Sequence, residues 1–116
     1  MELTKNETKL MEGEKEDLSP TDFLEQEDIL YQLAEEASEL AKAALKKARI
    51  IRDANPTPVT IYEANDNLME EIADVYNCIN QLEDTYVDRK IVDEKEARWV
   101  DRLQKHLIAQ KIKFNR

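Results

Sequence analysis

A helical spacing of apolar residues runs through most of this chain and constrains its fold more than any other feature. From Leu30 to Ile51 apolar residues recur every three or four positions, and the same spacing returns between Ile61 and Tyr86. Residues spaced in this way lie on one face of an α-helix. Hydrophobic residues make up 41% of the chain and aromatic residues only 6%, which is typical of an all-helical protein with a thin core.

The first long helix is predicted to begin at the start signal Ser19-Pro20 and to continue to about Asp53. Proline suits the first helical turn, where its missing N–H has no intrahelical partner. The Pro-containing segment 55–58 ends the helix, because proline cannot continue it and restricts the residue before it. The apolar stripe of this helix is predicted to contain Leu30, Leu33, Ala37, Leu40, Ala44, Ala48 and Ile51.

Two further helices are predicted downstream. Thr60 and Glu63 have the spacing of a capping box, which opens the second helix. A third helix is predicted to begin near Asp93, with Glu96 at the reciprocal capping position. The second helix turns inward Ile61, Leu68, Ile72, Val75, Ile79, Leu82 and Tyr86, and the third turns inward Trp99, Val100, Leu103 and Leu107.

The predicted fold class is therefore all-α, a small antiparallel helical bundle. Three amphipathic helices in a chain of 116 residues bury little apolar surface on their own. We expect homo-oligomerisation, as a homodimer or homotetramer, to complete the bundle.

Charge divides the chain into two parts. The 26 acidic and 17 basic residues give a net charge of −9, and residues 1–28 alone contain ten acids and three lysines. We therefore predict an acidic, partly mobile N-terminal segment over residues 1–28 and a helical domain over residues 29–116.

Composition excludes several classes of function. A surface this acidic repels the nucleic-acid backbone, so DNA and RNA are not expected partners. The single cysteine, Cys78, and single histidine, His106, exclude a disulfide framework and a Cys/His zinc site. The one glycine, Gly13, leaves no glycine-rich phosphate loop. No apolar run is long enough for a membrane span and the N-terminus lacks a signal peptide, so a cytoplasmic location is expected.

Two acidic clusters, at residues 35–39 and 70–74, have matching helical geometry. On a helical wheel Glu36 borders the apolar stripe of its helix, and Glu39 lies about 60° beyond it. Glu71 and Asp74 have the same relation on the second helix. If the two helices pack as an antiparallel hairpin, the two acid pairs face each other.

Carboxylates that converge in a partly buried place repel one another unless a cation compensates. Oxygen ligands without His or Cys suit Mg²⁺, or Mn²⁺, which typically binds a substrate phosphate as well. A di-iron site needs a Glu-x-x-His motif on two helices, and the sequence contains none. Acid pairs at this spacing are also common on solvated helix faces, which is the competing interpretation.

Other side chains are candidates for binding a nucleotide. Basic residues of the third helix, Lys95, Arg98 and Arg102, flank its apolar face and are candidates for the substrate phosphates, because Arg binds phosphate oxygens in bidentate fashion. They are equally able to form ion pairs with neighbouring acids. Gln32, Cys78 and Gln81 lie near the acid pairs on the helical wheel and are candidates for contacts with the substrate base.

The order Glu35-Glu36-x-x-Glu39 and then Glu71-x-x-Asp74 resembles the EExxE…ExxD signature of the MazG-like all-α nucleoside triphosphate pyrophosphohydrolases. This superfamily also contains dimeric dUTPases and dCTP pyrophosphatases. The resemblance covers about residues 30–107. The 31 residues between Glu39 and Glu71 are more than is usual for this signature, which affects the expected shape of the base pocket more than the metal site.

The resemblance implies an enzyme that cleaves the α–β phosphate bond of a nucleoside triphosphate and releases a monophosphate and pyrophosphate. It implies that Glu36, Glu39, Glu71 and Asp74 bind Mg²⁺ and that Glu35 is a catalytic carboxylate that orients water. The preferred base cannot be read from the sequence. The alternative hypothesis is a non-enzymatic acidic helical module that binds a partner protein.

Overall fold

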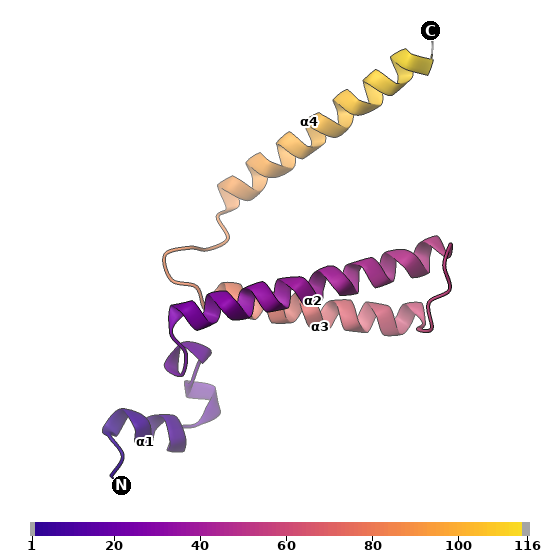
Figure 1. The fold of residues 1–116 in the computed structure, drawn as a ribbon. Helices are drawn as coiled ribbons and strands as arrows, with labels where there is room; N and C mark the ends of the chain where they lie inside the picture. The colour runs from indigo at the N-terminus through magenta and orange to yellow at the C-terminus, as the bar shows by residue number, and fades with distance from the viewer. Residues whose placement is uncertain (1, 115–116) are drawn as a thin grey trace. The chain divides into compact units, whose positions relative to one another are not determined.

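The computed structural model describes residues 2–114, and within this range the chain forms four α-helices, two short 3-10 helices and no strand (Figure 1). The predicted all-α class is confirmed. The chain divides into two compact units, Met1–Thr85 and Tyr86–Arg116. The charge distribution predicted a boundary after residue 28 instead. Among residues 2–114, no helix combines the length and apolar character that crossing a bilayer requires.

The N-terminal segment, expected to be partly mobile, contains helix α1 (Lys5–Glu12) and the 3-10 helices η1 (Lys15–Asp17) and η2 (Pro20–Asp22). The Ser19-Pro20 start signal opens η2 and not the first long helix, so that part of the prediction is wrong. The Ser19 N–H donates to Asp22 Oδ2 at 2.8 Å, which closes a capping box on this single turn.

Helix α2 (Gln26–Arg52) is the first long helix. It begins where the Asp28 carboxylate accepts the N–H of Glu25, at 3.0 Å. It ends at Asp53, which adopts the left-handed conformation (φ 51°) that Asp tolerates better than most residues, and whose N–H donates to the carbonyl of Arg49. The predicted end near Asp53 is confirmed.

Helix α3 (Ile61–Asn80) begins at the predicted cap. The Thr60 hydroxyl oxygen accepts the N–H of Glu63 at 3.1 Å, and the same hydroxyl donates to the Glu63 carboxylate. The helix ends one and a half turns earlier than we expected, at Asn80, so Tyr86 lies outside it. The chain leaves the α-helix after Asn80, where Gln81 and Leu82 donate their N–H groups in 3-10 fashion to the carbonyls of Cys78 and Ile79.

Helices α2 and α3 pack side by side as an antiparallel hairpin, as the sequence predicted (Figure 1). Gln26 fixes the open end of this hairpin. Its side-chain amide donates to the carbonyl of Gln81 at 2.9 Å, and its side-chain oxygen accepts the N–H of Glu83 at 2.8 Å. These two bonds join the first turn of α2 to the end of α3 and set the register between the helices.

The interface between α2 and α3, which we call the seam, differs from the predicted stripe by about one residue on α2. Ile29 and Ala43 are buried on α2, opposite a helix that buries Ala64 and Cys78. The predicted stripe residues Leu30 and Ile51 are 53% and 69% exposed. The α2 side of the seam contains Gln26, Ile29, Leu33, Glu36, Leu40, Ala43, Lys47 and Ile50, and the α3 side contains Ala64, Leu68, Glu71, Val75 and Cys78, followed by Leu82 just beyond the end of the helix.

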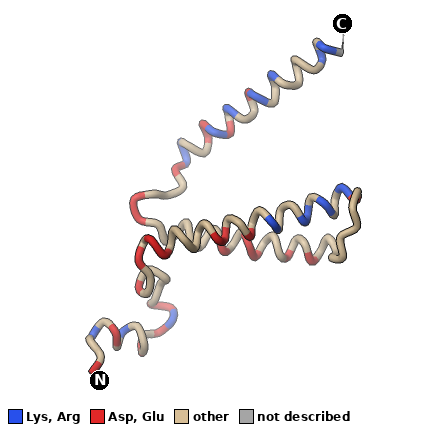
Figure 2. Tube along the Cα trace, viewed as in Figure 1, with Lys and Arg blue, Asp and Glu red and all other residues tan. Residues whose placement is uncertain are grey.

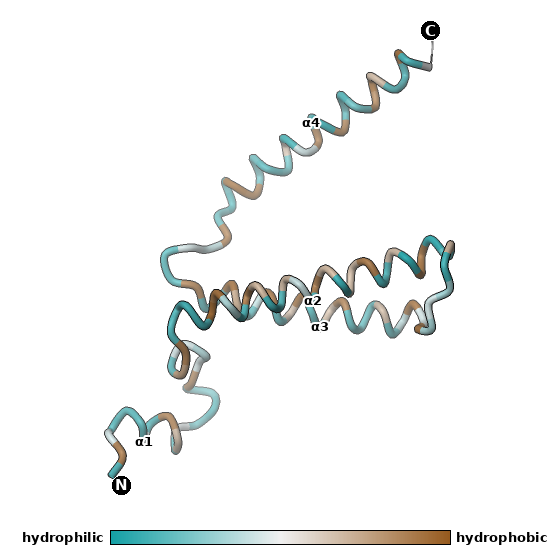
Figure 3. Tube along the Cα trace, viewed as in Figure 1, coloured by the Kyte–Doolittle hydropathy of each residue, from teal (hydrophilic) through white to brown (hydrophobic). Residues whose placement is uncertain are grey.

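The physical reason is that α2 has apolar residues on two adjacent faces, and periodicity alone does not say which of them meets α3. Figure 3 shows hydrophobic positions recurring along both α2 and α3. Small residues at the buried positions, with Ala43 and Ala64 each 2% exposed, allow the two backbones to approach closely.

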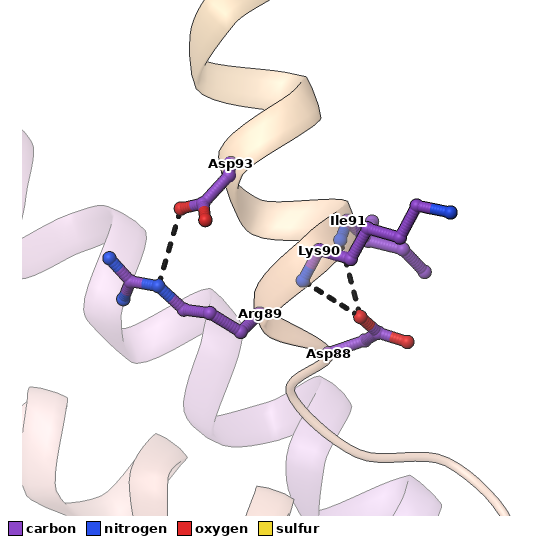
Figure 4. A network of polar contacts seen from close by, with 5 residues as sticks. All are labelled: Asp88, Arg89, Lys90, Ile91 and Asp93. Carbon is purple, nitrogen blue, oxygen red and sulfur yellow. Dashed lines mark hydrogen bonds and ion pairs between the residues drawn. The ribbon is translucent and has the colours of Figure 1, made fainter.

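Helix α4 (Arg89–Phe114) forms most of the second unit. It begins four residues before the predicted start at Asp93, because Asp88 provides the cap: its Oδ1 accepts the N–H groups of Lys90 and Ile91 at 2.9 and 3.3 Å (Figure 4). Asp93 instead forms an ion pair with Arg89 at 3.2 Å within the first turn. The predicted inward residues Trp99, Val100, Leu103 and Leu107 are all more than half exposed.

Candidate metal centre

The hairpin register places two glutamates at the same level of the seam. Glu36 is ten residues after Gln26 on α2, and Glu71 is ten residues before Gln81 on α3. Because Gln26 is bonded to the carbonyl of Gln81 and the helices run antiparallel, equal steps along both helices reach opposite positions. Both glutamates are half-buried, so the seam contains a carboxylate level between apolar levels.

Asp74 completes a group of three acids at this level. One carboxylate oxygen from each of Glu36, Glu71 and Asp74 lies within 4.8 Å of the other two. Asp74 is on the turn of α3 that follows Glu71 and is exposed, so the group opens to solvent on one side. Three of the four predicted metal ligands are thus brought together.

Electrostatics at this level penalises negative charge. Loss of water around Glu71 raises its pKa above the usual 4.5, and the charges of Asp74, Glu36, Glu39 and Glu70 raise it further, in that order. The described residues include no Lys or Arg within ion-pair distance of Glu71. The site therefore favours either a proton or a metal cation.

Glu39 and Glu35 differ from the three converging acids. The exposed Glu39 side chain lies 3.2 Å from Lys42 Nζ in an ion pair, although its charge still acts on Glu71. Glu35 is exposed on α2, and its carboxylate is not among the three converging groups.

Two of the three candidates for base contacts lie beside the acids. Gln32, one turn before Glu36, donates a hydrogen bond from Nε2 to Glu36 Oε1 at 2.8 Å. Cys78 is buried one turn after Asp74, where loss of water, then the charges of Glu36 and Asp74, raise the pKa of its thiol. A buried thiol in that state is neutral and a poor nucleophile.

Gln81 is the third candidate for a base contact, and its position indicates a structural role in the hairpin. It lies two turns beyond Asp74, and its carbonyl accepts the hydrogen bond from Gln26 that fixes the hairpin. Sequence inspection missed Gln26. The only available signal was a polar residue, Gln26, that continues the three- and four-residue spacing back from Ile29 and Leu33.

The basic candidates lie in the second unit. Lys95, Arg98 and Arg102 line one shallow depression on α4 together with Asp101. Asp101 forms an ion pair at 2.9 Å with Lys105, which is not one of the three basic candidates.

The donor set fits Mg²⁺. Oxygens bound to one Mg²⁺ lie about 2.1 Å from it, and hence roughly 3 to 4.2 Å from each other in an octahedron. Carboxylate oxygens that are at most 4.8 Å apart need only small side-chain rotations to reach that spacing. Three carboxylates also leave coordination positions for water and for substrate phosphate.

No protein-family model matches the sequence, and no curated protein or solved structure shows significant similarity to it.

Proposed function

We propose that this chain is a Mg²⁺-dependent nucleoside triphosphate pyrophosphohydrolase, similar to the MazG-like enzymes. The observation that carries the proposal is the convergence of Glu36, Glu71 and Asp74, with oxygens within 4.8 Å: the two glutamates are half-buried in a mostly apolar helical seam, and Asp74 lies exposed beside it. Uncompensated carboxylates at this place oppose folding, so their presence favours a role in binding a cation. Mn²⁺ has the same ligand preference and can replace Mg²⁺.

In this proposal the three converging carboxylates hold the cation at the solvent-facing side of the seam. When bound, Mg²⁺ would polarise the phosphate oxygens and offset the charge that develops on them. Gln32 holds Glu36 in place through its amide hydrogen bond, which limits the orientations of that ligand. Glu39 has its own ion pair to Lys42 and would join the ligand set by exchanging that partner.

Hydrolysis requires that a water oxygen bond to a phosphorus of the α–β linkage while the bridging P–O bond breaks. The proton of that water must pass to a base. We assign this role to Glu35, the exposed carboxylate next to the site, and assign Lys95, Arg98 and Arg102 to the phosphates. The products are a nucleoside monophosphate and pyrophosphate, and the active form is a homodimer or homotetramer.

A panel of canonical and modified nucleoside triphosphates, incubated with Mg²⁺ or Mn²⁺, tests the proposal directly. We expect pyrophosphate and the matching monophosphate from at least one member, identified by chromatography. Orthophosphate as the sole product, or no product from the whole panel, would reject the proposed reaction.

A non-enzymatic interaction module is the second candidate, favoured by the many large apolar side chains that the structure leaves exposed. A melting scan with and without Mg²⁺ distinguishes the two. At Mg²⁺ concentrations about 100 times the Kd, an enzyme with this site gains about 2.7 kcal/mol of stability, or roughly 10 to 20 °C in Tm. An interaction module without a metal site shows no such shift.

A further inference from the structure

The α2–α3 hairpin has a second apolar face beside the seam. On α2, positions 30, 34, 37, 41, 44 and 48 repeat the spacing of the seam about 100° further round the helix, and all are exposed. On α3, positions 62, 65, 69, 72, 76 and 79 have the same spacing; positions 62, 69, 72 and 76 are exposed, and 65 and 79 are half-buried. Two adjacent stripes with this spacing are typical of a helix that packs against two neighbours, and among the described helices of the first unit α2 and α3 pack closely only against each other.

These two stripes lie on the same side of the hairpin. Each stripe is displaced from the seam by about 100° in the N-to-C direction of its own helix. Because the two helices are antiparallel and their seams face each other, both displacements point to the same side of the hairpin. Asp74 and Glu39 are displaced about 60° from the seam in the other direction. The acidic site and the second apolar face are therefore on opposite sides of the hairpin.

The second apolar face contains large exposed side chains. Met69, Ile72 and Tyr76 are 68%, 51% and 63% exposed, and Leu30 is 53% exposed. The exposed alanines of α2 continue this apolar surface. Large exposed apolar patches mark interaction sites.

The charge on α2 indicates which partner fits. Residues 25–39 contain six acids and no Lys or Arg, whereas residues 42–52 contain five Lys or Arg and no acid (Figure 2). A second α2 that runs antiparallel places its basic half opposite the acidic half of the first, at both ends of the contact. A parallel arrangement places like charges together.

The alanines at positions 34, 37, 41, 44 and 48 allow two such helices to approach closely, with Ala41 near the midpoint of the stripe. Large side chains of α3 then flank this contact on both sides. The second apolar face is therefore complementary to the same face of another copy related by a two-fold axis, which is the symmetry of most homodimers.

We propose that the second apolar face of the α2–α3 hairpin binds the same face of a second copy of this chain, with the two α2 helices antiparallel. The inference deepens the homo-oligomeric part of the proposed function and is independent of its catalytic part.

Light scattering coupled to gel filtration of the full chain tests the face. The wild type is expected at a multiple of two chains of 13.6 kDa, and Ala41→Glu is expected as a monomer, with at least about 10-fold weaker association. Asn77→Glu adds the same charge at an exposed position of α3 away from this face, and should keep the wild-type mass. A monomeric wild type, or an Ala41→Glu variant that keeps its mass, overturns the proposal.

Cross-linking tests the orientation and does not depend on how Ala41→Glu folds. In an antiparallel α2 contact the two copies of residue 41 face each other, so Ala41→Cys should form a disulfide-linked dimer when diamide oxidises the two thiols. The wild type, whose one cysteine is buried, and Asn77→Cys should not. Failure of Ala41→Cys to cross-link in a dimeric protein rejects the antiparallel arrangement.

Mg²⁺ binding by Ala41→Glu, measured by calorimetry, separates this proposal from the catalytic one. Because the acids lie on the opposite side of the hairpin, a monomeric variant should bind Mg²⁺ as the wild type does. Loss of the dimer in a protein that never bound Mg²⁺ would support the interface and reject the metal site.

Discussion

Two levels of the same seam, two helical turns apart, have opposite chemistry. At one level Ala43 and Ala64 are each 2% exposed, and two methyl groups fill the space between α2 and α3. At the other, Glu36 and Glu71 meet with Asp74 beside them. The register and helix geometry are the same at both levels, so the difference lies in the side chains alone.

That difference shows which part of the hairpin serves stability and which does not. Apolar burial and close backbone approach at the alanine level stabilise the folded state. Carboxylates that face each other at the acidic level destabilise it, and apolar residues of similar size there would make a more stable hairpin. The acidic level is therefore expected to serve binding, and substitutions at the two levels should have separable effects.

The largest expected effect comes from removing an acid of the metal site. Asp74→Ala should lower turnover of the preferred nucleotide by about 1,000-fold, because it removes a ligand needed to neutralise charge in the transition state. Asp66→Ala, which removes an exposed carboxylate of α3 outside the trio, is the matched control and should retain turnover. Initial rates of pyrophosphate release measure both variants, and equal rates would refute the assignment of Asp74.

Placing a carboxylate at the level of Ala43 and Ala64 should destabilise the fold without removing a residue of the metal site. Ala43→Glu forces a large charged side chain between two helices in close contact, so we expect a loss of about 3 kcal/mol in the free energy of unfolding. Asn77→Glu adds the same group at an exposed position and should change stability by less than about 0.5 kcal/mol. Urea unfolding followed by circular dichroism measures both, and comparable values would mean that the level is not tightly packed.

Gln32 tests how firmly the acidic level is organised. Gln32→Ala removes the 2.8 Å hydrogen bond to Glu36 and should weaken Mg²⁺ affinity by roughly 10-fold, as loss of an outer partner of a metal ligand commonly does. Calorimetric titration with Mg²⁺ alone measures this without substrate. An unchanged Kd would return Gln32 to its other interpretation, a contact with the substrate base.

Much of the hairpin was predictable because it depends on local chemistry. The cap at Thr60, the end of α2 at Asp53 and the antiparallel pairing follow from short-range hydrogen bonds and from the prolines between the helices. The start of α4 was misplaced because Asp88 and Asp93 are both acceptable caps, and only the backbone decides which one is used.

The predicted convergence of Glu36, Glu71 and Asp74 is present in the structure, because it depends on helical phase. The one-residue error in the α2 stripe has a different cause: α2 has two apolar faces, and only tertiary contact selects one. Glu39 shares its helical phase with Asp74, yet it forms an ion pair with Lys42 and lies outside the trio. In the second unit, residue spacing predicts which side chains share a face of α4 but not what that face contacts.

The smallest expected effect is a pH dependence of stability that separates the two levels. The pKa of Glu71 is raised in the folded state, so the folded state holds this proton more tightly than the unfolded state. Without metal, the stability linked to Glu71 is complete below its usual pKa of 4.5 and is lost as pH rises through the raised value.

Glu71→Gln, which cannot ionise, should abolish that loss, whereas the control Glu63→Gln at the exposed start of α3 should not. Thermal melting in EDTA between pH 4.5 and 7 measures the slope, and Mg²⁺ should remove it in the wild type because the cation takes the place of the proton. A wild type and Glu71→Gln variant with identical slopes would mean that the acidic level carries no penalty for a cation to relieve.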